Sequence, residues 1–288
     1  MVKKVIVHTM LLLLALFCIL PFCMVVAVSF SAEKDVAMFG YSLIPHTFST
    51  EAYQYLFQQS GQLLRSYGVT IFVSLVGTLG GKCAMAGLAY PLSRSNFIFK
   101  RYLSLFLFVA MVFNGGLAPT YIWISNYLHL RDTVAVLILP LLVNVWNVFL
   151  LRTYFAAVPD SLIEAAVLDG AGELRILLQI MLPVSKVGIA TVSLFTLLIY
   201  WNDWFTSMIY IDSNRWVSLQ YLLYRIMDNI SFFKNSSQSV QAMLGGQDLP
   251  SETFRMAIAV VAAGPMVFIF TFFQKYFVKG VMVGSVKG

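Results

Sequence analysis

The side chains that could ligate a metal or hold a phosphate are few in this sequence and stand far apart. The histidines are His8, His46 and His129, and no cluster of Cys and His has metal-ligand spacing. The run Gly80-Gly81-Lys82 lacks the rest of a phosphate-binding loop and sits inside an apolar stretch. We therefore expect neither metal chemistry nor nucleotide hydrolysis from this chain.

The three cysteines also give little sign of chemistry. They are Cys18, Cys23 and Cys83, and all lie in apolar stretches rather than in loops. Such positions favour buried free thiols over a disulfide framework.

One segment, residues 158–183, has a spacing typical of binding rather than catalysis. Pro159 ends the preceding element, and Ser161 with Glu164 three residues later matches a capping box at the start of a short helix. Gly170 and Gly172 then predict a turn that ends this helix.

A second short helix is predicted after that turn. Its apolar residues recur at helical spacing at Leu174, Leu177 or Leu178, and Met181, and Pro183 marks the entry to the next element. Two partly apolar short helices suit docking into a groove of another protein. An interfacial amphipathic helix that contacts only lipid remains the alternative.

The elements that must position this segment are membrane spans. Of the 288 residues, 59% are hydrophobic and 11% are charged, which is too apolar for a soluble domain of this size. A helical span needs about 20 largely apolar residues. Six candidates satisfy this: Met10–Phe30, Ser66–Tyr90, Tyr102–Ile124, Thr133–Leu151, Val187–Ile211 and Met256–Gln274.

The first candidate span could instead be a cleaved signal peptide, because Lys3 and Lys4 precede it. Its apolar run is longer than that of most signals and continues through Pro21 without a clear cleavage site. We expect a retained span.

The net charge of +6 reflects orientation in the membrane. With the N-terminus inside, most of the Lys and Arg residues fall on the cytoplasmic side, which places both termini there. The basic excess therefore needs no nucleic-acid partner. Two long outer segments, about 31–65 and 212–255, are either solvated connectors or contacts for an extracytoplasmic partner.

The pattern Glu164-Ala165-Ala166-x-x-Asp169-Gly170-Ala171, followed by Ile180-x-Leu182-Pro183, closely resembles the EAA motif of ABC importer permeases. In that family the motif forms a cytoplasmic coupling helix that sits in a cleft of the ATPase subunit. The resemblance implies ATPase contact by eight residues. They are Glu164, Ala165, Ala166, Asp169, Gly170, Ala171, Leu182 and Pro183.

The rest of the chain resembles the carbohydrate-uptake branch, specifically a maltose-permease-like smaller subunit. The resemblance rests on the six spans, the long first outer segment, the Trp201-Asn202-Asp203 region and the C-terminal residues 279–288. It implies a tail, residues 275–288, that reaches the ATPase dimer through Gly284, Ser285 and Lys287. Within the branch, permeases for oligosaccharides, polygalacturonan or alginate are the most similar.

This resemblance implies an all-α membrane protein with the type I ABC importer permease fold, built as one transmembrane domain over residues 1–288 in the bacterial cytoplasmic membrane. It would bind no cofactor, since ATP and Mg²⁺ belong to the partner ATPase. The implied partners are a second homologous permease, two ATPase subunits, an extracytoplasmic solute-binding protein, membrane lipid and a sugar or oligosaccharide.

Polar and aromatic residues inside the spans are candidates for the sugar path, because hydroxyls need polar partners and sugar rings need aromatic faces. The candidates are Asn114, Asn144, Trp146, Asn147, Trp201, Asn202 and Asp203, with Trp204 beside them. Interhelical hydrogen bonds and an interfacial aromatic belt are the competing explanation for each one. Lys82, charged within a span, either snorkels or pairs with a partner subunit.

Three other functions compete with the importer. A secondary, ion-coupled transporter would need internal repeats and ionisable residues at the midplane, and we find only Lys82 and Asp203 within spans. A membrane-embedded enzyme would need a catalytic set that is absent. An ABC permease for a non-sugar solute is disfavoured only by the resemblance of the tail and outer loop.

Overall fold

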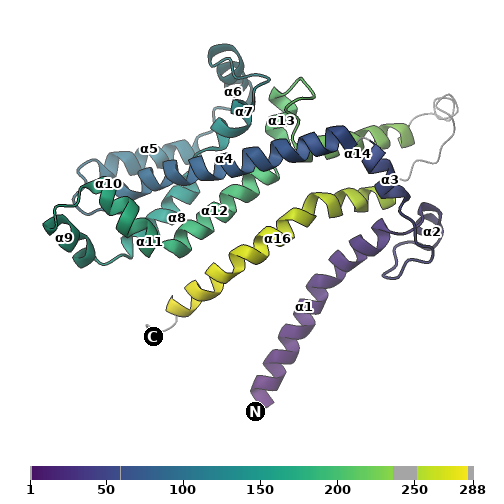
Figure 1. The fold of residues 1–288 in the computed structure, drawn as a ribbon, viewed down its shortest axis with the longest axis horizontal. Coiled ribbons are helices and arrows are strands. Elements are labelled where there is room, and N and C mark those ends of the chain that lie inside the picture. Colours follow the sequence, from purple (N-terminus) through teal and green to yellow (C-terminus); the bar gives the residue numbers. More distant parts are fainter. Residues whose placement is uncertain (1, 59, 236–251, 285–288) are drawn as a thin grey trace. The chain divides into compact units, whose positions relative to one another are not determined.

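The computed structural model describes residues 2–58, 60–235 and 252–284, and over these ranges the chain is almost entirely helical (Figure 1). The chain divides into two compact units. The first unit comprises residues 1–65 and 222–265, and the second comprises 66–221 and 266–288.

The first unit contains α1 (Val2–Ser29), α2 (Glu33–Phe39), α3 (Glu51–Gln58), most of α14 (Leu219–Asn235) and the start of α16 (Glu252–Gly284). α1 is apolar around its whole circumference and exposes nearly all of its large side chains, as a helix in contact with lipid or a partner would. Within this unit, the Glu33 carboxylate accepts hydrogen bonds from the first two backbone N–H groups of α16.

The second unit holds the remaining helices. They are α4 (Ser60–Ser93), α5 (Lys100–Val112), α6 (Leu117–Ile122), η1 (Trp123–Tyr127), α7 (Val134–Ile138), η2 (Leu139–Leu141), α8 (Val145–Ala156), α9 (Asp160–Leu168), α10 (Glu173–Ile176), η3 (Leu177–Met181), α11 (Leu182–Val184), α12 (Lys186–Trp201) and α13 (Phe205–Tyr210).

Small residues let the helices of this unit approach closely. A Cβ added to Gly77 of α4 would lie 2.3 Å from the Tyr200 ring of α12, and one added to Gly81 would lie 2.7 Å from the Leu142 carbonyl. The Tyr200 hydroxyl donates a 2.8 Å hydrogen bond to the Ile138 carbonyl of α7. Gly77 and Gly81 are thus packing positions in a continuous 34-residue helix.

The third and fourth predicted spans are bent rather than straight, and a further bend comes directly before the fifth. Among the described residues, three helices (in α1, α4 and α16) are long and apolar enough to cross a membrane, and three bent helix pairs raise the number to six. The pairs are Lys100–Val112 with Leu117–Tyr127, Val134–Leu141 with Val145–Ala156, and Glu173–Val184 with Lys186–Trp201, bent by 109°, 51° and 87°.

Local chemistry explains these corrections. The third predicted span breaks at residues 113–116, where Gly116 adopts φ +85° and the Asn114 side chain accepts a hydrogen bond from its backbone N–H. The fourth breaks before Asn144, which caps α8. The fifth ends at Trp201 rather than at Ile211, and its last residues form the separate α13.

The cysteines also differ from the prediction. Cys18, Cys23 and Cys83 are free, as expected, but each is exposed on the isolated chain rather than buried. Their helix faces are directed away from the protein core, which suits contact with lipid or with another subunit.

Candidate functional site

The first helix of the candidate coupling segment begins two residues earlier than predicted. α9 starts at Asp160 with Pro159 as its N-cap, and no side chain caps it. Ser161 is therefore already helical, so the predicted capping box with Glu164 was wrong. Pro159 tolerates this position because its missing N–H would have no partner at a helix start, and Asp160 interacts favourably with the helix dipole.

The end of α9 follows the predicted glycine turn. Gly170 adopts φ +75°, its N–H donates to the Val167 carbonyl at 3.0 Å, and the Ala171 N–H donates to the Ala166 carbonyl at 2.9 Å. These two bonds around a left-handed glycine form a Schellman motif. The turn is followed by α10, which begins at Glu173, so the predicted second helix is present.

One face of the segment is built into the core of the second unit. Ile163, Ile176 and Met181 are fully buried in a hydrophobic cluster that also contains side chains of α4, α5, α8 and α12. Ala166 and Ala171 pack against the same cluster. The two alanines therefore pack partly against the chain's own core, and their contact with the ATPase stays a prediction.

A polar contact ties the same segment to α4. The hydroxyl of Tyr90, which is buried, donates a hydrogen bond to the carboxylate of Glu173 at the start of α10. Neither residue was singled out in the sequence, because the two are 83 residues apart and belong to no shared motif.

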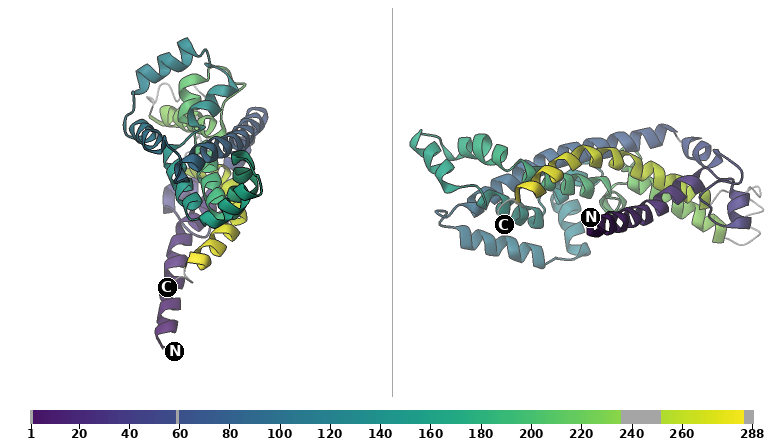
Figure 2. Two further views of the ribbon diagram at one scale, coloured as in Figure 1. Left: turned by 90° about the vertical axis from the view of Figure 1, so that its left-hand side faces the viewer. Right: turned by 90° about the horizontal axis from the view of Figure 1, so that it is seen from below.

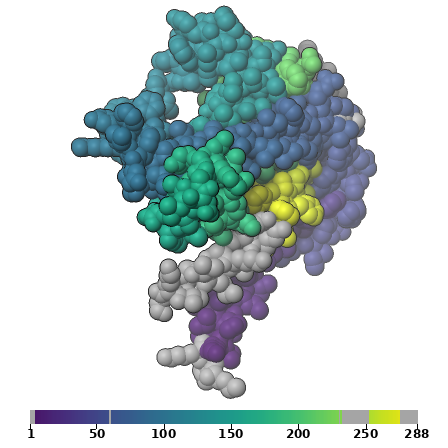
Figure 3. All heavy atoms as spheres, turned by 60° about the vertical axis from the view of Figure 1, so that its left-hand side comes forward, coloured from purple at the N-terminus to yellow at the C-terminus, as the bar shows by residue number. Residues whose placement is uncertain are grey.

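The opposite face is unusually apolar for a surface. Glu164, Ala165 and Asp169 are exposed there. Large apolar side chains lie exposed on α9, α10 and η3, with Leu168 at 88% exposure. The others are Leu162, Val167, Leu174 and Leu178. The right-hand view of Figure 2 shows this segment, in green-teal, at one end of the second unit, and in Figure 3 it forms a surface that faces the viewer. Such a patch needs a partner surface to cover it.

The two distal motif residues and the tail complete the candidate contacts. Leu182 is half-buried against the hydrophobic cluster, and Pro183 is exposed. Gly284 is the last residue of α16, whereas Ser285 and Lys287 lie outside the described residues.

The polar pathway candidates are mostly engaged in local hydrogen bonds. The Asn144 side chain accepts from the Asn147 N–H at 3.1 Å, and Asn147, 2% exposed, donates to Thr196 at 3.4 Å. Asn202 donates to the Leu198 carbonyl, and Asp203 accepts from the Thr206 N–H. Asn114 occupies the bend between α5 and α6 described above.

The tryptophans separate in a similar way. Trp201 is buried, with its ring 6.5 Å from that of Tyr67, while Trp146 is largely exposed. The structure therefore does not gather the pathway candidates into one cluster. Among the described residues, no group of three or more His, Cys, Asp or Glu could hold a metal ion.

Residues 75–283 match the sequence profile of the binding-protein-dependent transport system inner membrane component. The chain belongs to this family. It is therefore a multi-span permease component of the inner membrane, and the expectation that it is not itself an ATPase is confirmed. Dependence on a binding protein, together with the ABC class, implies ATPase and binding-protein partners.

Individual relatives agree with this membership. The polygalacturonan/rhamnogalacturonan transport system permease protein YtcP of Bacillus subtilis is 37% identical over 98% of this chain and 97% of its own length. The arabinooligosaccharides permease AraQ of Halalkalibacterium halodurans is 25% identical over 96% of this chain and 93% of its own.

A solved structure shares the fold. One chain of a bacterial ABC transporter involved in the import of the acidic polysaccharide alginate superimposes with a TM-score of 0.80 over 96% of both chains, at 25% identity. The predicted all-helical ABC importer permease fold is confirmed by this match.

Proposed function

We propose that this chain is one of two homologous permease subunits of an ATP-driven importer that moves an oligosaccharide into the cytoplasm. Two ATPase subunits, which hold ATP and Mg²⁺, would complete the membrane complex, and an extracytoplasmic protein would deliver the solute. The observation that carries the proposal is the two-faced segment 158–183, buried on one side and apolar but exposed on the other.

This arrangement suits the conversion of ATPase closure into movement of the spans. A partner that covers Leu168 and its exposed neighbours would move α9 as the ATP sites close. Because Ile163, Ile176 and Met181 share one core with α4, α8 and α12, the displaced helix would carry those spans as a rigid body. The chain performs no covalent step, and its role is to open and close the passage.

The relatives indicate the solute class. One full-length relative is named for polygalacturonan and rhamnogalacturonan, another for arabinooligosaccharides, and the matching structure imports alginate. We infer that the solute is an oligosaccharide, with an acidic one favoured.

The assignment is tested by the substitution Leu168→Asp in the assembled transporter. A carboxylate among the exposed apolar side chains around Leu168 should abolish copurification of the ATPase and ATP-dependent uptake. ATPase binding would bury this carboxylate without a partner, which is costly. Ile44→Asp is the matched control, since Ile44 is 80% exposed in the predicted outer segment. Normal ATPase association of the Leu168 variant, or uptake that needs no ATPase, would overturn the proposal.

A further inference from the structure

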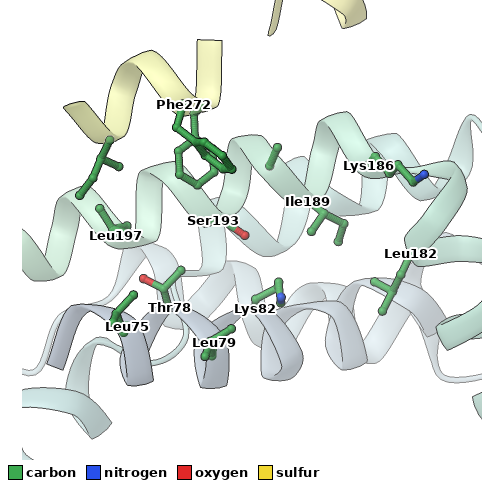
Figure 4. A pocket seen from close by; sticks show the side chains of 13 residues that line it. Leu75, Thr78, Leu79, Lys82, Leu182, Lys186, Ile189, Ser193, Leu197 and Phe272 are labelled. Carbon is green, nitrogen blue, oxygen red and sulfur yellow. The ribbon is translucent and has the colours of Figure 1, made fainter. Parts of the chain in front are cut away.

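A second feature of the second unit is a pocket of about 570 Å³ between α4, α12 and the C-terminal part of α16 (Figure 4). Its walls are mostly apolar. The polar lining residues are Thr78, Lys82, Lys186 and Ser193. Lys82 needs an explanation, because a charge within a span is costly, and Lys186 adds a second charge to the same pocket from the first residue of α12.

The charged residues of the pocket lie toward one end. α4 and α12 run antiparallel, since Gly77 meets Tyr200 and Gly81 meets Thr196. Leu75, Leu197 and Phe272 therefore lie at one end, while Lys186 lies at the other with Lys82 between them (Figure 4). The apolar run from Lys186 to Leu197 is about 17 Å long, comparable with the acyl layer of one leaflet, about 15 Å.

Nothing within the described part of the chain neutralises the two lysines, since neither forms an ion pair there. Thr78, only 8% exposed, also has a hydroxyl without a hydrogen-bond partner among the described residues. The charged end adjoins segment 158–183, because Lys186 follows it directly. If that segment is cytoplasmic, as the proposed function requires, the charged end faces the inner leaflet.

We propose that this pocket binds an anionic phospholipid of the cytoplasmic leaflet. The phosphate lies between Lys82 and Lys186, with Lys82 extending along α4 toward the charged end, and an acyl chain lies along Leu75, Leu197 and Phe272. The ligand matches the charge distribution of the pocket, since it is anionic at one end and uncharged along the rest, where the lining is apolar apart from Thr78 and Ser193. A saccharide would instead need many hydroxyl partners, and the wall offers only Thr78 and Ser193 besides the lysines.

The test is a titration of the purified, assembled transporter with phosphatidylglycerol and phosphatidylcholine, followed by native mass spectrometry. The wild type should prefer phosphatidylglycerol. Lys82→Gln and Lys186→Gln should each weaken that preference about fivefold, the effect of one basic residue near a lipid surface.

Two further variants separate the pocket from general surface charge. Arg101→Gln removes an exposed charge from the start of α5, outside the pocket, and should leave the preference unchanged. Ile269→Trp fills the apolar wall without altering charge and should lower the binding of phosphatidylglycerol.

An unchanged lipid preference in both lysine variants would overturn the proposal. The same holds if the variants raise the KM for an acidic oligosaccharide and leave lipid binding intact, since the pocket would then belong to the solute path. Lipid binding is measured without ATP or solute, so loss of ATP-driven uptake alone would contradict the proposed function and not this site.

Discussion

At the scale of single residues, Gly170 sets the direction of the chain between α9 and α10. Its φ of +75° is a conformation that residues with a Cβ adopt only at a cost, and a Cβ there would meet no atom within 4 Å. The cost of a substitution is therefore backbone strain rather than a steric clash.

We expect Gly170→Ala to destabilise the segment by about 1 kcal/mol and to weaken ATPase association. Gly172→Ala is the matched control, because Gly172 has φ −73° and ψ 161°, which alanine adopts freely, and has equally open space. Thermal unfolding and ATPase copurification measure both variants. Equal effects of the two substitutions would show that the left-handed turn is not what matters.

The Tyr90–Glu173 hydrogen bond is the residue-scale link between α4 and the coupling segment. Tyr90→Phe keeps the ring packing and removes the donor, at a cost of about 1 kcal/mol. We expect more ATP to be hydrolysed per solute imported, because α10 loses its polar attachment to α4. Tyr102→Phe, which alters an exposed tyrosine of α5, should leave this ratio unchanged.

A double-mutant cycle with Glu173→Ala, which removes the acceptor, tests whether the two residues act through one hydrogen bond. Additive effects of the two substitutions would show that Tyr90 and Glu173 do not act through a shared hydrogen bond. The sequence could predict Gly170, because a glycine that ends a short helix has a known local role. It could not predict Tyr90, since only the packing of α4 against α10 brings two such distant residues together.

At the scale of elements, hydropathy located the apolar segments but not their bends. Composition measures how apolar a stretch is and carries no information on direction. At both bends an asparagine side chain, Asn114 or Asn144, accepts a hydrogen bond from a nearby backbone N–H group. Irregular backbone at membrane depth is tolerated only where its polar groups are paired in this way. The prediction of a capping box at Ser161 was also wrong for a local reason, because Pro159 is the N-cap residue of α9 and Ser161 already lies within the helix.

Asp132, just before α7, forms hydrogen bonds with the segment that follows α13. Its carboxylate accepts hydrogen bonds from the Ser213 N–H and hydroxyl and from the Asp212 N–H. These bonds, the Ser213 N–H foremost, lower the pKa of Asp132 below its ordinary value. Arg131 adds an ion pair to Asp212 at 2.8 Å.

A group with a lowered pKa stabilises the folded state above the pKa of the unfolded chain, and that contribution is lost as pH falls through the folded pKa. We therefore expect the melting temperature of the wild type to fall below about pH 4 by more than that of Asp132→Asn. At neutral pH the variant should be the less stable of the two. Parallel pH profiles would show that Asp132 has no such role.

At the scale of the whole molecule, every functional statement depends on which side of the membrane segment 158–183 occupies. The distribution of Lys and Arg predicts the cytoplasm, as it does for both termini. The same distribution places the segment between α2 and α3, which contains His46, outside. Topology is a property of the assembled spans, so it is tested on intact cells.

Single cysteines in a background without Cys18, Cys23 and Cys83 decide the matter. Those three thiols are exposed on the isolated chain, so they would otherwise contribute to the labelling. A membrane-impermeant maleimide should label His46→Cys in intact cells and Asp169→Cys only after the membrane is opened. Both positions are exposed on the isolated chain, so in cells that lack the partner ATPase access to the reagent depends on the bilayer and not on burial. Labelling of Asp169→Cys from outside would place the apolar patch around Leu168 where no ATPase can reach it, and the importer mechanism would fail with it.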